Sequence, residues 1–357
     1  MSAKPPYKVP SMDEIDAIPW NGYNVVSTFV GAGGSCLGYR MAGYRVIWSN
    51  EFIPAAQECY KANHKNSILD TRDIRKVKPQ DILDATGLKI GEIDIFNGSP
   101  PCASFSIAGK REDAWGKVKK YSDSKQRVDD LFYEYIRLID GTKPKVFVAE
   151  NVAGLIKGVA KGYFIDILKR LKSCGYNVKC KVLDAQWLGV PQMRQRTIFM
   201  GVRDDLGLEP VYPKPLTYKY DFRDAVETIH KDDSLFYELP KGKMLNVYNE
   251  TRDDENGRFE DAYFRLYGKK SSFNHVRVCW DLPCRTVLQG SNSIYHPEKP
   301  RTLTINEVKR VCSFPDDFIL KGTFKQQWER LGRAVPPVMM SHIAKTIKTE
   351  ILEKCVG

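Results

Sequence analysis

The sequence predicts an α/β fold with a mostly parallel sheet, joined to a smaller, loop-rich second domain. Strand and helix signals alternate through the first 200 residues, a pattern typical of parallel sheets with helices on both faces. From Asp204 the alternation stops, and residues 204–280 are rich in Asp, Asn, Tyr, Lys and Gly without sustained periodicity. Helical signals return after Arg301, so we expect the end of the chain to re-enter the first domain.

Short runs of β-branched and aromatic residues mark the expected strands. These strands are residues 23–29, 45–49, 93–96, 146–149, 178–182 and 197–202. Between and after them, apolar residues recur at the spacing of helices. The expected helices are residues 34–42, 54–63, 131–139, 164–171, 306–312 and 338–351. In sheets of this kind a ligand binds beyond the carboxyl ends of the strands.

A chain of 357 residues exceeds a typical single domain. We expect residues 1–203, completed by residues 326–357, to form one domain, and residues 204–325 to form the smaller one with its return segment. No apolar run approaches the roughly 20 residues of a membrane span, and the first 20 residues hold no signal-peptide core. These observations predict an intracellular protein.

The net charge of +11 favours a polyanionic partner. The excess lies in residues 1–203, with 31 basic and 21 acidic residues, whereas residues 204–280 hold 12 basic and 15 acidic ones. Charge alone leaves a merely basic surface as an equal alternative. The nine cysteines show no C-x-x-C spacing, which argues against a metal or disulfide framework and predicts free thiols, one of which could be reactive.

Glycines follow the first strand, in a turn that precedes a helix. Phe29-Val-Gly31-Ala-Gly33-Gly34 has the setting in which backbone approaches a bound nucleotide, although a tight structural turn explains it equally well. Glu51 stands 20 residues after Gly31, where such folds place a carboxylate on ribose hydroxyls. Asp73-Ile74, near the third strand, could contact an adenine amino group.

Three further segments carry residues suited to chemistry at strand ends. In Gly98-Ser-Pro-Pro-Cys102 the two prolines stiffen the backbone and fix the direction of a cysteine that could act as a thiolate nucleophile; an inert loop cysteine is the alternative. Glu150, in Ala-Glu-Asn-Val152, leaves an apolar strand and could serve as a general acid. Arg194 and Arg196, at alternate positions, would point to one side and bind a phosphate, a carboxylate or a base edge.

The order of these segments resembles that of the DNA cytosine-5 methyltransferases. Arg301-x-Leu303-Thr304-x-x-Glu307 and Gly332-Arg-Ala-Val335-Pro336 continue the resemblance, which covers about residues 22–203 and 283–350. It implies a Rossmann-like, S-adenosylmethionine-dependent methyltransferase fold, with residues 204–280, the variable segment, as the target-recognition domain. The chain departs from the family pattern at Ser27-Thr28, at Ala103 and at Arg333, where the family usually has asparagine.

The resemblance also implies a role for each site residue. Cys102 would attack carbon-6 of cytosine, Glu150 would contact the ring N3 and the amino group, and Arg194 and Arg196 would brace the flipped base and the nucleophile. No metal is implied. The residues expected to hold S-adenosylmethionine are Phe29, Gly31, Gly33, Gly34, Glu51, Phe52, Asp73, Ile74, Pro100 and Val335.

Double-stranded DNA would be the substrate, and residues 104–123, with their Gly, Lys and Ser, would form a lid over the flipped base. The resemblance further implies a monomer in the cytoplasm of a prokaryote or a phage-infected cell, associated with the nucleoid. It allows a companion restriction endonuclease that is not physically bound. The target sequence and any preference for hemimethylated DNA are left open.

Three alternatives remain at this stage. A tRNA cytosine-5 methyltransferase of the same fold would usually carry Cys-Phe-Thr, which residues 204–280 lack. An amino-methyltransferase would need an aromatic residue after Pro-Pro, where this chain has Cys102. A non-catalytic DNA-binding homologue would have no need to keep both Cys102 and Glu150.

Overall fold

The computed structural model describes residues 4–101, 119–121, 124–126, 130–156, 160–229, 234–252, 257–271, 274–290 and 293–355. The chain forms two compact units, which we call the sheet unit and the insert unit. The sheet unit comprises residues 13–183, 195–214 and 339–357. The insert unit comprises residues 1–12, 184–194 and 215–338.

A seven-stranded sheet in the order β3-β2-β1-β4-β7-β10-β8 forms the centre of the sheet unit. Strands β3, β2, β1, β4 and β7 run parallel to their neighbours, whereas β10 runs antiparallel to β7. The mostly parallel sheet that the sequence predicts is therefore confirmed. The strands are β1 (Asn24–Thr28), β2 (Arg45–Asn50), β3 (Ile68–Asp70), β4 (Ile95–Gly98), β7 (Val146–Val152), β8 (Tyr176–Asp184) and β10 (Gln195–Arg203).

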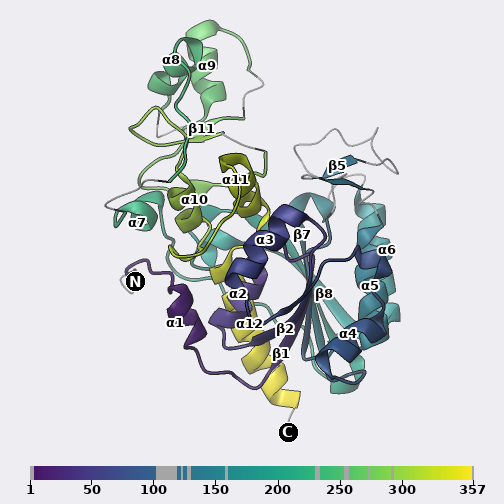
Figure 1. The fold of residues 1–357 in the computed structure, drawn as a ribbon. Helices are drawn as coiled ribbons and strands as arrows, with labels where there is room; N and C mark the ends of the chain where they lie inside the picture. The colour runs from purple at the N-terminus through teal and green to yellow at the C-terminus, as the bar shows by residue number, and fades with distance from the viewer. Residues whose placement is uncertain are drawn as a thin grey trace. The chain divides into compact units, whose positions relative to one another are not determined.

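Helices cover both faces of this sheet. Figure 1 shows α4, α5 and α6 on one face and α2, α3 and α12 on the other. Their bounds are α2 (Gly34–Met41), α3 (Pro54–Asn63), α4 (Pro79–Thr86), α5 (Leu131–Thr142), α6 (Ala160–Ser173) and α12 (Pro337–Glu350). The chain passes between the units five times, in α1 (Met12–Asp16), after residues 183, 194 and 214, and in α12. A small antiparallel pair also belongs to the sheet unit, β5 (Lys119–Tyr121) with β6 (Ser124–Gln126).

Apolar side chains of α4, α5 and α6 pack on the sheet in one continuous core. Tyr135, on α5, joins two strands across this core, because its hydroxyl donates to the carbonyls of Phe96 on β4 (3.0 Å) and Val148 on β7 (2.9 Å). A Cβ at Gly98 would lie 2.4 Å from the Tyr135 ring, so only glycine fits at the end of β4. The core thus fixes the backbone that leads to Cys102.

The insert unit contains more helix than its sequence suggests. Its α8 and α9 pack through Val247, Tyr248, Phe259 and Ala262 into a small core of their own. The sequence analysis missed both helices, because eight or nine residues give too few turns for apolar periodicity to show. The elements are α7 (Phe222–Val226), α8 (Lys243–Glu250), α9 (Phe259–Tyr267), α10 (Ile305–Val311), α11 (Phe324–Arg333), β9 (Gln192–Met193), β11 (Val276–Arg277), β12 (Cys284–Arg285) and β13 (Ile294–Tyr295).

The boundaries of the two units differ from the expected division at residues 203 and 326. Residues 184–194 belong to the insert unit because β9 pairs in parallel with β12. Residues 326–338 belong to it as well, whereas residues 204–214 belong to the sheet unit. The functions assigned to the two expected domains stay predictions.

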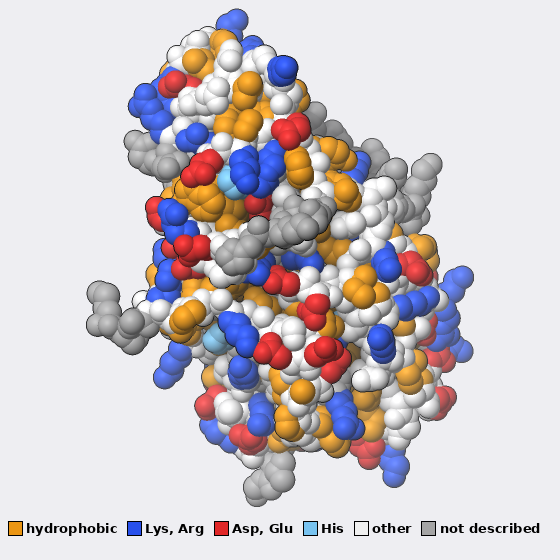
Figure 2. Space-filling model, turned by 60° about the vertical axis from the view of Figure 1, so that its left-hand side comes forward, with side chains coloured by type: hydrophobic (Ala, Val, Ile, Leu, Met, Phe, Trp, Pro, Cys, Tyr) orange, Lys and Arg blue, Asp and Glu red, His pale blue; other side chains and the backbone are white. Residues whose placement is uncertain are grey.

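Two surface properties bear on the expected partners. Within the described residues, no helix is both long and apolar enough to cross a membrane. On the face drawn in Figure 2, Lys and Arg side chains are interspersed with Asp and Glu. The net positive charge does not form a single basic patch on that face, so charge alone does not locate a nucleic-acid site.

Candidate active site

The predicted site residues of the sheet unit lie at one edge of the sheet. Thr28, at the end of β1, pairs with Asn50 of β2 and Gly98 of β4. Gly98 in turn pairs with Ala149 of β7, so the carboxyl ends of four neighbouring strands meet there. Phe29 and Glu51 directly follow β1 and β2, Pro100 stands two residues after β4, and Glu150 lies within the last three residues of β7.

The turn after β1 takes backbone conformations that favour glycine. Phe29, Gly31 and Gly33 have φ values of 54°, 57° and 95°, and Gly34 begins α2. A Cβ at Gly31 would meet no atom within 4 Å, so the turn borders open space at this position. A Cβ at Gly33 would lie 2.1 Å from Nε2 of His64. The absence of a side chain therefore has a different effect at each glycine. It leaves open space beside the backbone at Gly31, and it allows His64 to pack closely at Gly33.

The side chain of His64 packs against this turn at Gly33, a contact that the sequence analysis missed. Its ring is buried and stacks on Tyr60 with the ring centroids 4.3 Å apart. Nδ1 lies 3.2 Å from Nη1 of Arg40, and because arginine can only donate, Nδ1 accepts. Burial, the largest cause, and the Arg40 charge hold the pKa of His64 well below its usual value. A neutral ring thus fills the space under Gly33.

Glu51 joins the glycine turn to the start of α3. One carboxylate oxygen accepts from the backbone N–H of Gly31 and the other from that of Ile53, both at 2.7 Å. Glu51 is only 7% exposed, so these two bonds fix the carboxylate at the strand end. The adjacent Phe52 is 38% exposed and offers an uncovered aromatic ring. This arrangement is suited to a ligand with hydroxyl groups and a flat ring.

Asp73 and Ile74 follow β3 at the beginning of a short 3₁₀ turn. Asp73 accepts from the backbone N–H of Arg75 (3.0 Å) and pairs with its guanidinium (3.1 Å). Arg75 also pairs with Asp130, and Ile74 is buried. The Asp73 carboxylate is thereby held in its own turn, and its contact with a ligand stays a prediction.

Pro100, two residues before Cys102, is tied to the neighbouring strand. Asn151 of β7 donates from its side-chain amide to the Pro100 carbonyl at 3.1 Å. This bond joins the Pro-Pro-Cys segment to the Glu-Asn-Val segment, which the sequence places 48 residues apart. Cys102 itself and residues 104–118 of the expected lid lie outside the described residues.

The other eight cysteines are poorly suited to act as nucleophiles. Burial is the largest cause that raises the pKa of several of these thiols, to about 11 for Cys174 and to about 12 for Cys180. The remaining thiols with this shift are Cys36, Cys284 and Cys355. Cys59, Cys279 and Cys312 are buried. Since a thiolate needs access and a low pKa, the chemistry of the described cysteines leaves Cys102 as the best candidate.

Glu150 and Arg196 form an ion pair at the same edge. Nε of Arg196 lies 2.7 Å from Oε1 of Glu150; Glu150 is buried and the side chain of Arg196 is largely covered. The antiparallel register places Arg196 opposite Val152, two residues beyond Glu150. The guanidinium therefore fixes the direction of the carboxylate.

Arg194 has separate partners, all in the insert unit. Its guanidinium donates to the carbonyls of Val287 (3.0 Å), Gly332 (2.8 Å) and Ala334 (2.9 Å). It is 1% exposed and holds the segment that contains the buried Val335. Arg194 and Arg196, which the sequence analysis expects to point to one side, thus lie in different units and have different partners. The geometry supports a positioning role for Arg194. Arg333, the departure from the usual asparagine, pairs with Glu329 at 2.8 Å.

Residues 23–349 match the family described as C-5 cytosine-specific DNA methylase. The type II methyltransferase M.NgoFVII of Neisseria gonorrhoeae is 31% identical over 343 residues, which cover 92% of this chain and 87% of that protein. M.MthTI of Methanothermobacter thermautotrophicus is also 31% identical, over 92% of this chain and 98% of its own length.

Among solved structures, the fold is similar to that of a prophage-encoded protein from E. coli that is named as a DNA modification methyltransferase. The TM-score is 0.69 at 21% identity, over 92% of this chain and 99% of that one. Fold and family together imply the use of S-adenosylmethionine. The chain belongs to the C-5 cytosine-specific DNA methylase family.

Proposed function

We propose that the protein transfers the methyl group of S-adenosylmethionine to carbon-5 of a flipped cytosine in a specific double-stranded DNA sequence, through a covalent bond between Cys102 and carbon-6. The observation that carries this proposal is the joined edge of β4 and β7. There the Asn151–Pro100 bond joins the residues before Cys102 to β7, the strand that carries Glu150 with its partner Arg196, and this connection supports the proposal. Family membership supplies the reaction class.

The turn after β1 is suited to hold the cofactor, which supplies an electrophilic methyl group on sulfonium. Open space at Gly31 lets a ligand approach the backbone, and the Glu51 carboxylate, held by Gly31 and Ile53, lies at the strand end where such folds contact ribose hydroxyls. Phe52 offers its exposed ring to the adenine. The other residues proposed to line this site are Phe29, Gly33, Gly34, Asp73, Ile74, Pro100 and Val335.

The protein's own residues perform the activation of cytosine. Carbon-5 is a weak nucleophile. Addition of the Cys102 thiolate to carbon-6 gives carbon-5 the reactivity of an enamine carbon. Glu150, held by Arg196, contacts N3 and the amino group as electron density builds there. After carbon-5 is methylated, loss of its proton restores the double bond and expels the thiolate. Arg194 positions the segment around Val335 through three backbone carbonyls.

The reacting atoms lie within the base stack of duplex DNA, so the cytosine must leave the helix. We assign target recognition to the insert unit, which includes residues 215–280 of the variable segment. We also infer a monomer that acts on DNA in the cytoplasm, at the nucleoid, beside a restriction endonuclease that it does not bind. Type II methyltransferases among the relatives support this setting.

Bisulfite sequencing tests this function most economically. Cells that express the wild-type chain should carry unconverted cytosines at one recurring sequence in DNA, and cells that express Cys102→Ala should not. Transfer RNA from the same cells should convert fully. Unconverted cytosines in tRNA alone, or methylation of an amino group, would replace the proposed reaction with one of its alternatives.

A further inference from the structure

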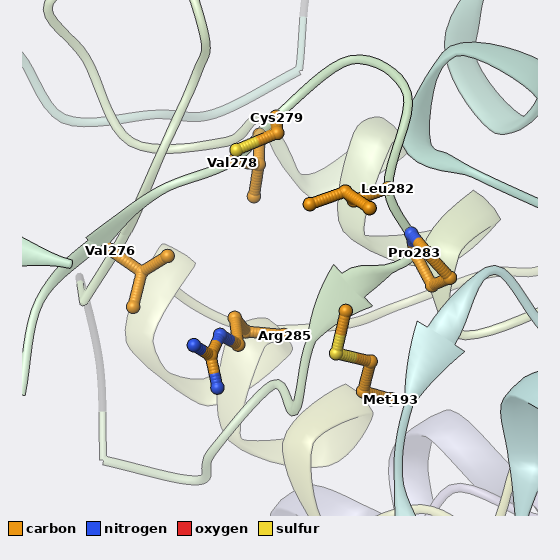
Figure 3. Close-up of a pocket in the computed structure, with 7 residues that line it drawn as sticks. All are labelled: Met193, Val276, Val278, Cys279, Leu282, Pro283 and Arg285. Atoms are coloured by element: carbon orange, nitrogen blue, oxygen red, sulfur yellow. The ribbon is translucent and has the colours of Figure 1, made fainter. Parts of the chain in front are cut away.

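A small hollow in the insert unit has apolar walls and a single charged residue. Figure 3 shows it between Met193 of β9 and the segment that runs from Val276 to Arg285. Its apolar side chains come from Met193, Val276, Val278, Leu282 and Pro283. Among the described residues that line it, Arg285 is the only one that carries a charge.

Arg285 has no hydrogen-bond or ion-pair partner within the described part of the chain. Its Nε is buried without a partner, although the side chain as a whole is only partly covered. Burial first, and then the nearby charge of Arg258, lower the pKa of Arg285, while Asp261 acts in the opposite direction without pairing. The Nε of Arg277 is buried in the same way, so this atom alone does not indicate a ligand. Because no described residue accepts from the partly exposed Arg285 guanidinium, its Nη groups can donate to an acceptor that arrives with a ligand.

The backbone holds Arg285 in a defined place. Strand β12 pairs in parallel with β9, with Arg285 opposite Met193. The hydroxyl of the next residue, Thr286, donates to the Met193 carbonyl. Met193 directly precedes Arg194, which the proposed function assigns to positioning the segment around Val335. The hollow therefore lies on the strand pair that continues into the active-site segment.

The chemistry of the hollow favours a base edge over a phosphate. Phosphate oxygens are strongly hydrated and are usually held by several donors, whereas this lining provides one guanidinium among apolar groups. The O6 and N7 atoms of guanine match the two-donor fork of arginine in the major groove. Apolar walls beside the fork can contact the ring atoms and the carbon-5 position of a neighbouring pyrimidine.

We propose that Arg285 reads a guanine in the target sequence through the major groove, by donating from its two Nη groups to the edge of that base. This inference rests on the proposed function, since it takes DNA as the substrate. It places a specificity residue outside residues 204–280, where the sequence analysis expects recognition.

A duplex library with random bases around a cytosine tests the inference. Bisulfite sequencing of the methylated members gives the base preference at each position for the wild type, for Arg285→Met and for Lys241→Met. Lys241 is an exposed residue of the same unit, and its replacement removes the same charge. Arg285→Met should lose roughly 5- to 150-fold discrimination for guanine at one position, while Lys241→Met should keep every preference.

Three results would overturn the assignment. The first is that Arg285→Met keeps the base preferences of the wild type. The second is a uniform loss of affinity for all sequences with a reduced salt dependence of binding, as expected for a phosphate contact. The third is a relaxed base preference at several positions at once. Replacing the read guanine by 7-deazaguanine removes the N7 acceptor; this should slow the wild type and leave Arg285→Met unaffected. A gel-shift selection on the same library reports the preferences without methyl transfer, so a failure of the proposed chemistry is separately visible.

Discussion

Arg196 Nε lies 2.7 Å from the Glu150 carboxylate, and the two side chains are 13% and 9% exposed. They extend from neighbouring antiparallel strands, β10 and β7, at the edge where the Pro-Pro-Cys segment begins. Because both charges are shielded from water, each depends on the other far more than an exposed pair would. This pair gives the central carboxylate of the site one direction.

Removal of one partner should therefore destabilise the fold strongly. Arg196→Met leaves Glu150 buried and unpaired, and we expect a loss of about 3–5 kcal/mol in the free energy of unfolding. Arg170→Met breaks the exposed Arg170–Asp166 pair, also on the sheet unit, and should cost about 0–1 kcal/mol. Urea denaturation of both variants measures the difference. Equal losses would mean that the Glu150–Arg196 pair behaves as a surface contact.

The two glycines of the first turn should respond differently to alanine. At Gly33 the new Cβ would meet His64, so overpacking of about 1–3 kcal/mol adds to the cost of a positive φ. At Gly31 the Cβ enters open space, so stability should fall by only about 1–2 kcal/mol while calorimetric affinity for S-adenosylmethionine drops. In a His64→Ala background Gly33→Ala should become less harmful. Additive effects of Gly33→Ala and His64→Ala would contradict this packing account.

Glu51→Gln should weaken cofactor binding more than it weakens the fold. Glutamine retains the size of the side chain, but it loses the charge and one of the two acceptors used by Gly31 and Ile53. We expect a loss of about 1.5–3 kcal/mol in calorimetric affinity for S-adenosylmethionine. Glu58→Gln, on the exposed surface of α3, removes the same charge and serves as the control. An equal loss of S-adenosylmethionine affinity in Glu51→Gln and Glu58→Gln would show that the loss comes only from a long-range charge effect.

Stability should fall as the pH decreases below about 6.5. Burial, the largest cause, and the charges of Arg301 and Lys299 lower the pKa of His296 to about 3. Between pH 6.5 and 3 the unfolded chain binds a proton at this residue that the folded chain does not, so each such histidine costs about 1.4 kcal/mol per pH unit. His64, His275 and His342 are shifted in the same direction.

His296→Asn isolates the contribution of one histidine. The asparagine oxygen can replace Nδ1, which accepts from the backbone N–H groups of Glu298 and Lys299. Denaturation curves from pH 7 to pH 4 should show a shallower loss of stability for this variant. An identical pH dependence, or a wild type that gains stability toward pH 4, would refute the assignment.

The sequence predicted the parts of the site that follow strand ends. The first four residues of β7, residues 146–149, are buried and read as a continuous apolar run, so the polar Glu150 and Asn151 at the end of that run stand out. His64 and Tyr135 gave no such signal. Each acts through a contact with a distant segment, Gly33 for His64 and the carbonyls of two strands for Tyr135, and spacing along the chain does not reveal such contacts.

Alternation along the chain was a weaker guide to Arg194 and Arg196. A spacing of two residues in an extended segment predicts that the two side chains point to the same side. This segment, however, passes from β9, which pairs with β12, to β10, which pairs with β7. The partner strands differ, so the guanidinium groups find different acceptors. The short helices α8 and α9 were missed for a related reason, because their stability comes from packing against each other.

Trapping of the covalent intermediate tests the central claim most directly. In a target duplex with 5-fluorocytosine at the methylated position, fluorine replaces the proton whose loss expels the cysteine, so the adduct cannot resolve. The wild-type chain should give a protein–DNA species that survives denaturation, and Cys102→Ala should give none. Absence of this species with the wild type, on a duplex whose unfluorinated form is methylated, would contradict the account, as would an adduct with Cys102→Ala.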